Sequence, residues 1–175
     1  MRLVFPELVH KEKAIEFINE FYAYHSEIDG SGSLDRYLKE STYEDWHKKV
    51  IADMDIANIS LPRVPELTYF YICEENEKIV GMINIRLALN DFLRTEAGHI
   101  GYCIRPTERK KHHGTNMLRS ALKVCDTLGI HDVILSCDKT NPASAHVIQN
   151  CGGELEAEFY SEAFQEIIQR YVIKR

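Results

Sequence analysis

Hydrophobic residues in the amino-terminal third of the chain recur at three- and four-residue steps, the spacing of amphipathic helices. The clearest stretch, residues 11–25, has apolar positions at Ile15, Ile18, Phe21 and Tyr22. A flexible Asp-Gly-Ser-Gly connector at residues 29–32 follows it. Ser33 predicts the start of a short second helix, and the Ser41-x-x-Glu44 pattern predicts the cap of a third. We therefore expect a mostly helical amino-terminal segment.

Beyond Pro65 the pattern changes to short runs rich in β-branched and aromatic residues, which are typical of strands. The runs at residues 67–73 and 79–89 flank a polar turn and predict an antiparallel hairpin. Gly81 inside the second run predicts a bulge or a close approach of another backbone. Further strands are expected at residues 99–104, 132–137, 154–160 and 165–173.

Two helices are expected between these later strands. The first has an apolar face and ends at Gly129, and the second follows Asn141 and Pro142 and ends before Gly152. The apolar face of the first is formed by Met117, Leu118, Ala121, Leu122, Cys125 and Leu128. Strands that alternate with helices after an antiparallel start predict an α/β or α+β domain, with a mixed sheet and helices on both faces.

The length and composition indicate one ordinary globular domain spanning residues 1–175. A chain of 175 residues with 45% hydrophobic and 27% charged residues can bury a core without a disulfide or metal. The five cysteines are scattered singly, without the spacing of a zinc site, so we expect reduced thiols and no metal. No apolar run reaches the length of a membrane span, and the amino terminus lacks a signal-peptide pattern. We expect a cytoplasmic protein with no membrane partner.

The formal net charge of -6 argues against a protein that coats nucleic acid, so any phosphate site must be a local basic patch. The richest such patch is residues 105–115, between a predicted strand and a predicted helix, with cations at Arg105, Arg109, Lys110 and Lys111. A helix amino terminus offers unpaired N–H groups and a positive dipole end to an anion. A solvated basic turn is equally compatible with this pattern. No Walker or dinucleotide-binding glycine motif is present.

One stretch of the chain, from about Gly98 to Gly153, resembles the GCN5-related N-acetyltransferases (GNAT). The resemblance rests on the following residues: Tyr102-Cys103-Ile104, Pro106, the loop Arg109-Lys110-Lys111-His112-His113-Gly114, the amphipathic helix, the strand Val133–Cys137, and Asn141-Pro142-Ala143-Ser144. It implies a mostly antiparallel central sheet of about six to seven strands, with the cofactor-binding core at residues 98–153. It also implies acetyl-CoA as the acetyl donor.

The resemblance assigns the cofactor's pyrophosphate to the loop amides. In the family the loop reads [QR]-x-x-G-x-[GA]; Arg109 takes the first position and Gly114 the last, but His112 stands where the first glycine is usual. The strand at Cys103 and Ile104 would pair with the pantetheine amides as an added strand does. Asn141 matches an asparagine that commonly meets the pantetheine arm. The complete set of cofactor-binding candidates is Cys103, Ile104, Arg109, Lys110, Lys111, His112, His113, Gly114, Thr115, Asn141 and Ser144.

The resemblance leaves the proton-transfer residues open. The family's tyrosine that protonates the leaving thiolate corresponds to Ile148, and a glutamate used as base by some members corresponds to Ser136. A lysine-like amine is only about one part in a thousand neutral at pH 7.4, so a base is needed. Glu96 and His99 are the candidate bases, and Tyr102 is a candidate donor to the sulfur. Each of these three side chains could equally have a structural or solvated role.

The sequence is compatible with two functions. The leading hypothesis is transfer of acetyl from acetyl-CoA to a primary amine of a small molecule or peptide by direct attack. The alternative is a non-catalytic acyl-CoA-binding or regulatory domain, which would explain the residues that depart from the family pattern. The acceptor is not identified, because an acidic protein attracts polyamines, amine-bearing antibiotics and peptide amines alike. A homodimer, usual in the family, is left open.

Overall fold

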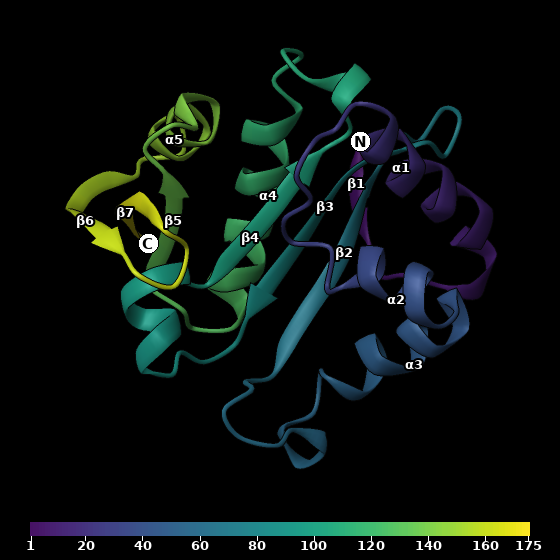
Figure 1. The fold of residues 1–175 in the computed structure, drawn as a ribbon, viewed down its shortest axis with the longest axis horizontal. Coiled ribbons are helices and arrows are strands. Elements are labelled where there is room, and N and C mark those ends of the chain that lie inside the picture. The colour runs from purple at the N-terminus through teal and green to yellow at the C-terminus, as the bar shows by residue number, and fades with distance from the viewer.

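The computed structural model describes all 175 residues, whose strands form two antiparallel sheets. The first sheet has the order β1-β2-β3-β4, and the second has the order β5-β7-β6 (Figure 1). Their bounds are β1 (Arg2–Val4), β2 (Glu66–Ile72), β3 (Ile79–Arg86), β4 (Ile100–Ile104), β5 (Asp132–Asp138), β6 (Glu154–Ser161) and β7 (Glu166–Lys174). A single bridge between Gly98 and Leu135 joins the two sheets.

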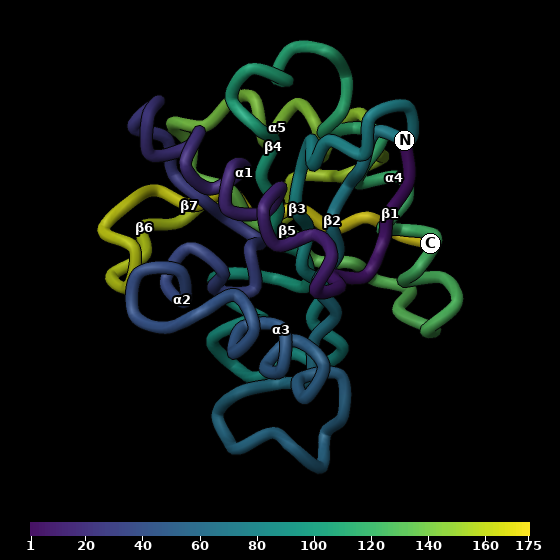
Figure 2. The backbone as a smooth tube through the Cα atoms, turned by 90° about the vertical axis from the view of Figure 1, so that its right-hand side faces the viewer, coloured from purple at the N-terminus to yellow at the C-terminus, as the bar shows by residue number.

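Helices cover both faces of the first sheet. Figure 2 shows α1 (Lys11–Ala23) and α2 (Leu34–Glu40) on one side and α4 (His113–Thr127) on the other. Helix α3 (Tyr43–Ala52) packs with α2 against β2, and α5 (Pro142–Gln149) follows β5. The predicted fold class is confirmed: it is an α/β domain with antiparallel strands and a helical amino-terminal segment. The expected single mixed sheet is divided into a four-stranded and a three-stranded antiparallel sheet, because β4 and β5 separate beyond Gly98. The strand β1 was not predicted, because three residues carry too little pattern to identify a strand.

Two hydrophobic cores hold the layers together. The larger one lies between α4 and the inner faces of both sheets, where α4 contributes the apolar stripe predicted from its sequence. The smaller one joins α1, α2 and α3 to the opposite face of the first sheet through Phe17, Phe21, Trp46 and Phe70. Alternate residues of β2 and β3 therefore point into different cores, which explains why these strands are buried on both faces.

Local details differ from the sequence expectations at two places. The cap of α3 is Thr42, whose hydroxyl accepts a hydrogen bond from the Asp45 amide, so the cap lies one residue after the predicted Ser41. Residues 90–98, expected as a connector, contain the short π-helix η3 (Leu93–Ala97). Three 3-10 turns complete the chain, namely η1 (Leu8–His10), η2 (Ile56–Asn58) and η4 (Pro106–Glu108).

Gly81 in β3 allows neighbouring elements to approach closely. A Cβ atom there would lie 2.9 Å from both the Cys103 carbonyl oxygen and the Met117 sulfur. The register between β2 and β3 also shifts next to Gly81, between Tyr71 and Ile72. Both interpretations of this glycine, a bulge and a close approach, are therefore confirmed.

Candidate active site

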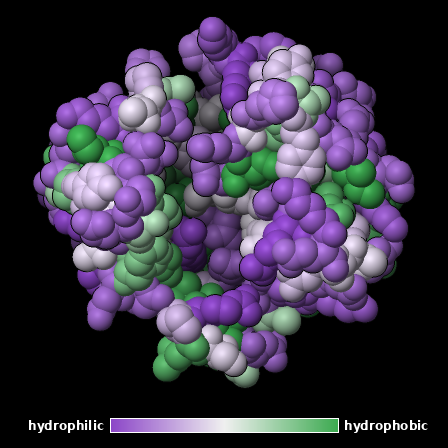
Figure 3. Space-filling view, viewed as in Figure 1, coloured by the Kyte–Doolittle hydropathy of each residue, from purple (hydrophilic) through white to green (hydrophobic).

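One edge of β4 is open toward the second sheet. The Arg105 amide donates to the Val80 carbonyl and the His99 carbonyl accepts from the Arg86 amide, so the odd-numbered residues of β4 hydrogen-bond to β3. The N–H and C=O groups of Tyr102 and Ile104 consequently face β5, which pairs with this part of the chain only at Gly98. Figure 3 shows a hollow on this face of the molecule, between the β5–β7 side and the α1–α3 side.

The loop after β4 presents a row of backbone amides. Lys110 and His112 adopt left-handed conformations, with φ of 63° and 61°, which turn the chain sharply just before α4. The first hydrogen bond of α4 runs from the Asn116 amide to the His112 carbonyl, which leaves the amides of residues 113–115 without protein acceptors. The amino terminus of α4 therefore has the geometry of an anion site. His112 itself adopts the backbone conformation for which the family motif uses glycine.

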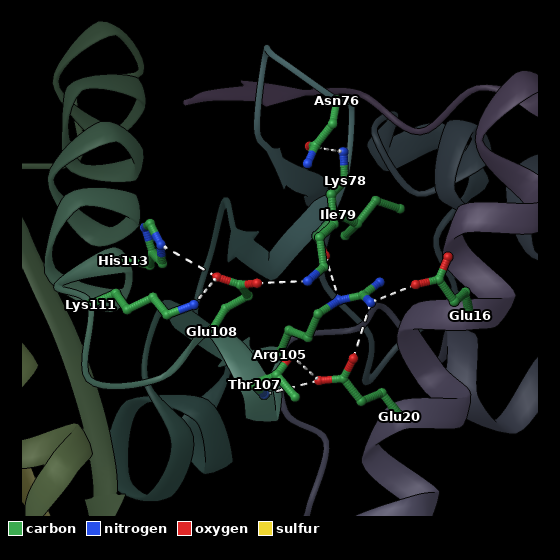
Figure 4. Close-up of polar contacts among 10 residues, drawn as sticks. All are labelled: Glu16, Glu20, Asn76, Lys78, Ile79, Arg105, Thr107, Glu108, Lys111 and His113. Carbon is green, nitrogen blue, oxygen red and sulfur yellow. Dashed lines mark hydrogen bonds and ion pairs between the residues drawn. The ribbon is translucent and has the colours of Figure 1, made fainter.

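Arg105 is structural, because its guanidinium is almost completely buried. Its Nε donates to the Ile79 carbonyl at 2.8 Å, and its Nη1 donates to Glu16 at 2.8 Å and Glu20 at 3.1 Å (Figure 4). The other carboxylate oxygen of Glu20 accepts from the amide and hydroxyl of Thr107. Helix α1 is thus fastened to the loop, and Arg105 is not available to a phosphate.

Lys111 is the one remaining loop cation that is paired with a carboxylate. Glu108 accepts hydrogen bonds from Lys111 at 2.8 Å and Lys78 at 2.6 Å, and His113 Nε2 lies 3.9 Å away. Hydrogen bonds from these two lysines lower the pKa of the Glu108 carboxyl to about 2. The pairing of Glu108 with Lys78 could not be predicted from the sequence, because the two residues lie 30 positions apart.

Arg109 and Lys110 differ in their contacts. The Arg109 guanidinium donates to the Ile104 carbonyl at 3.1 Å and to the Ser26 hydroxyl at 2.6 Å, and it stacks over Phe21. Lys110 has no hydrogen-bond or ion-pair partner within the chain. Neither cation is paired with a carboxylate, but Arg109 is held by neutral acceptors, so Lys110 is the loop cation whose charge is both uncompensated and free of contacts.

The start of α5 lies across the gap from β4. The Asn141 side-chain oxygen accepts from the Ser144 amide at 3.1 Å, which caps α5 and leaves the Asn141 amide group free to donate. The Tyr102 hydroxyl lies 2.9 Å from the Ser144 hydroxyl, and burial raises the pKa of Tyr102 above its ordinary value. The structure therefore brings Tyr102, Asn141 and Ser144 together. It does not bring Cys103 to the gap, because the Cys103 backbone faces β3.

The two candidate bases lie just before β4 and differ in their hydrogen bonding. His99 is buried, and its Nδ1 accepts from the Ile134 amide at 3.0 Å, so one nitrogen lone pair is already used. Burial, and then the charges of Arg94 and Arg86, lower the pKa of His99. Glu96, on η3, has a buried carboxylate oxygen with no hydrogen-bond partner. Glu96 therefore has the freer lone pairs of the two.

The chain contains no cluster of three or more His, Cys, Asp or Glu side chains that could hold a metal ion. None of its helices combines the length and the apolar character needed to cross a bilayer. All five cysteines are free thiols.

Solved structures with the same fold come from several acetyltransferases. A variant of the spermidine N-acetyltransferase from Vibrio cholerae has a TM-score of 0.65 and 16% identity, over 99% of this chain and 95% of that chain. The microcin C7 self-immunity acetyltransferase, solved with acetyl-CoA and AMP, has a TM-score of 0.69 and 17% identity, over 99% and 91%. The ribosomal L7/L12 alpha-N-protein acetyltransferase, solved with coenzyme A, has a TM-score of 0.69 and 16% identity, over 98% and 92%.

At these identities the similar structures establish the fold. No curated protein sequence matches the chain. The family model of the acetyltransferase (GNAT) domain matches residues 18–154, which is most of the chain and includes β4, the loop and α4. The chain belongs to the GNAT family of acetyltransferases.

Proposed function

We propose that the chain binds acetyl-CoA between β4 and α5 and transfers its acetyl group to a primary amine by direct attack. The observation that supports this most strongly is that two sets of unpartnered backbone groups meet at one end of β4. These are the N–H and C=O groups of Tyr102 with the N–H group of Ile104, and the amides of residues 113–115. The first set suits the amide groups of a pantetheine arm, and the second suits a pyrophosphate.

The side chains near these groups fit the same ligand. The free amide group of Asn141 can donate to a pantetheine carbonyl while its oxygen caps α5. Lys110 supplies the uncompensated positive charge beside the α4 amides. Acetyl-CoA supplies an activated thioester, so the chain's own work is to orient the reactants and to move two protons.

The two protons are assigned to Glu96, which precedes β4, and to Tyr102, at the middle of this strand. Attack by the amine nitrogen forms the C–N bond and breaks the C–S bond, so the amine loses a proton and the sulfur gains one. Glu96 removes the amine proton in this proposal, because it has an unpartnered carboxylate oxygen, whereas the Nδ1 of His99 is occupied. Tyr102 protonates the sulfur in this proposal, because its hydroxyl lies at the start of α5, in the gap between β4 and α5, and carries its proton at neutral pH.

Thiol release from acetyl-CoA tests the proposal directly. The purified protein would be incubated with a panel of polyamines, amino acids, peptides and amine-bearing antibiotics, with and without acetyl-CoA. We expect amine-dependent release of coenzyme A. Saturable acetyl-CoA binding with no thiol release from any amine would favour the non-catalytic alternative, which the apolar Ile148 at the family's tyrosine position motivates. Neither binding nor release would refute both functions.

The acceptors of similar proteins include spermidine and a ribosomal protein amino terminus. Both are amines, and both are compatible with an acceptor that approaches from the side opposite α4. Figure 2 shows the β6–β7 turn and the connector between α1 and α2 on that side. A cytoplasmic location, and the absence of nucleic-acid and membrane partners, remain predictions.

A further inference from the structure

A pocket of about 450 Å³ lies at the other end of β4 from the loop. It is on the face of the second sheet that points away from α4. Val133 and Leu135 of β5 belong to the core beneath α4, so the alternate residues Asp132 and Ile134 face the opposite side and line the pocket. Val172, the cross-strand partner of Ile134, completes an apolar floor.

His99 offers this pocket a hydrogen-bond donor that no protein atom uses. Because Nδ1 of His99 accepts from the Ile134 amide, the neutral ring carries its proton on Nε2. The side chain is only 9% exposed, lines the pocket, and has no acceptor for Nε2 within the chain. The Nε2–H group is therefore open to the pocket, where a ligand can accept its hydrogen bond in place of water.

The charges around the pocket leave one cation uncompensated. Arg94, on η3, lines the pocket and its guanidinium has no carboxylate partner. Of the two carboxylates in the lining, Glu156 accepts from Arg170 at 2.8 Å, whereas Asp132 and Lys174 stand opposite each other in the register of β5 and β7 without an ion pair. Their opposite charges cancel, so the charge of Arg94 is in excess. Arg94 and the Nε2–H of His99 together form a site for a carboxylate, which accepts hydrogen bonds from both.

The dimensions of the pocket indicate an organic ligand rather than a simple ion. Its volume is within the range of small-molecule sites, and its floor of Ile134 and Val172 suits a short hydrocarbon chain. His99 precedes Tyr102 by three residues, which is about 10 Å along an extended strand. A ligand bound at His99 therefore reaches the part of β4 where acetyl transfer is proposed.

We propose that this pocket binds the carboxylate of the acetyl acceptor, so that the preferred acceptors are amines with a carboxylate about 10 Å from the reacting nitrogen. This inference rests on the proposed acetyl transfer. It separates acidic amines from polyamines, which carry no negative group and would meet Arg94 unfavourably.

A matched pair of acceptors tests the selectivity. Initial rates would be measured for 8-aminooctanoate and for its uncharged amide, with the wild-type chain, Arg94→Gln and Lys123→Gln. Lys123 is exposed on α4, on the opposite side of the molecule, so its variant controls for the loss of one positive charge. We expect kcat/KM at least about tenfold higher for the acid than for the amide, because a charge-assisted pair is lost in the amide.

Arg94→Gln should reduce this preference at least about fivefold without changing KM for acetyl-CoA, whereas Lys123→Gln should leave the preference intact. Equal use of acid and amide by the wild-type chain would overturn the proposal. So would an equal loss for both acceptors in Arg94→Gln, because a merely structural role of Arg94 would affect both.

A binding measurement keeps this result separate from the proposed function. In ¹⁵N-histidine NMR spectra, hexanoate should shift the Nε2 resonance of His99, hexanamide should not, and Arg94→Gln should weaken the effect. No shift with hexanoate would overturn the carboxylate site even if amines are acetylated. A shift without thiol release from any amine would refute the acetyl transfer and leave the carboxylate site in place.

Discussion

The two ends of β4 satisfy their polar groups in opposite ways. At the carboxyl end, Arg105, Arg109 and Lys111 are all engaged by acceptors of the chain itself, and apart from the Lys110 side chain the groups left over are backbone amides. At the amino end, the polar groups left over are side chains, namely the Glu96 carboxylate, the His99 Nε2–H and the Arg94 guanidinium.

This difference corresponds to two kinds of ligand. Backbone amides held by a buried network suit the part of a ligand that is the same in every reaction, such as the pyrophosphate of the cofactor. Their geometry does not depend on side-chain rotamers. Side chains with unused donors and acceptors can be replaced one by one during evolution. They suit a ligand that differs from one enzyme to another, such as the acetyl acceptor. In the proposed function, the donor site therefore lies at the loop and the selectivity for the acceptor at η3.

The largest expected effect comes from removing the buried arginine at the carboxyl end of β4. Arg105→Leu should lower the free energy of unfolding by about 3 kcal/mol, because it leaves the Glu20 carboxylate and the Ile79 carbonyl without their buried donor. Urea denaturation measures the change. Lys123→Gln should unfold like the wild-type chain. A loss under about 1 kcal/mol in Arg105→Leu would show that the buried network does not stabilise the loop.

The proposed proton transfer predicts different effects for substitutions of Glu96 and His99, the two candidate bases before β4. Glu96→Gln should reduce kcat about 100-fold at pH 7. The loss should be smaller at pH 9, where more of the amine is already neutral.

His99→Asn should cost much less, since an asparagine oxygen can still accept from the Ile134 amide. pH profiles of kcat for both variants provide the measurement. A large loss in His99→Asn together with a normal profile in Glu96→Gln would transfer the role of base to His99.

Neighbouring lysines of the loop give a finer test. Lys110→Gln should raise KM for acetyl-CoA roughly threefold and make it less sensitive to salt, because Lys110 has an uncompensated charge. Lys111→Gln should have a smaller effect, since Lys111 is paired with Glu108. Equal effects of the two substitutions on KM would mean that Glu108 releases Lys111 when acetyl-CoA binds.

The smallest effect is expected at His112. A non-glycine residue in the left-handed region is strained by about 1 kcal/mol, so His112→Gly should leave stability unchanged or raise it slightly. KM for acetyl-CoA should stay unchanged, because only the amide direction matters. Thermal unfolding and initial rates measure both quantities. A large increase in KM would show that the imidazole itself contacts the ligand.

The sequence predicted the elements well where a pattern of many residues encodes them, as in the apolar stripe of α4 and the hairpin of β2 and β3. It did not reveal β1 or the division of the strands into two sheets, because strand partners depend on distant segments. Within the site, the loop and Asn141 were predicted by their local motif. The neutralisation of Arg105 by Glu16 and Glu20 could not be predicted, since those partners lie more than 80 residues away.

The central claim, that acetyl-CoA binds between the α4 amides and α5, is tested most directly by isothermal titration of acetyl-CoA into the wild-type chain and Asn141→Ser. Serine caps a helix as asparagine does but lacks the free amide donor, so folding is preserved and one ligand contact is removed. We predict saturable binding that weakens roughly fivefold in the variant, with thermal stability unchanged. Equal affinity for both proteins, or no binding to the wild-type chain, would contradict the account.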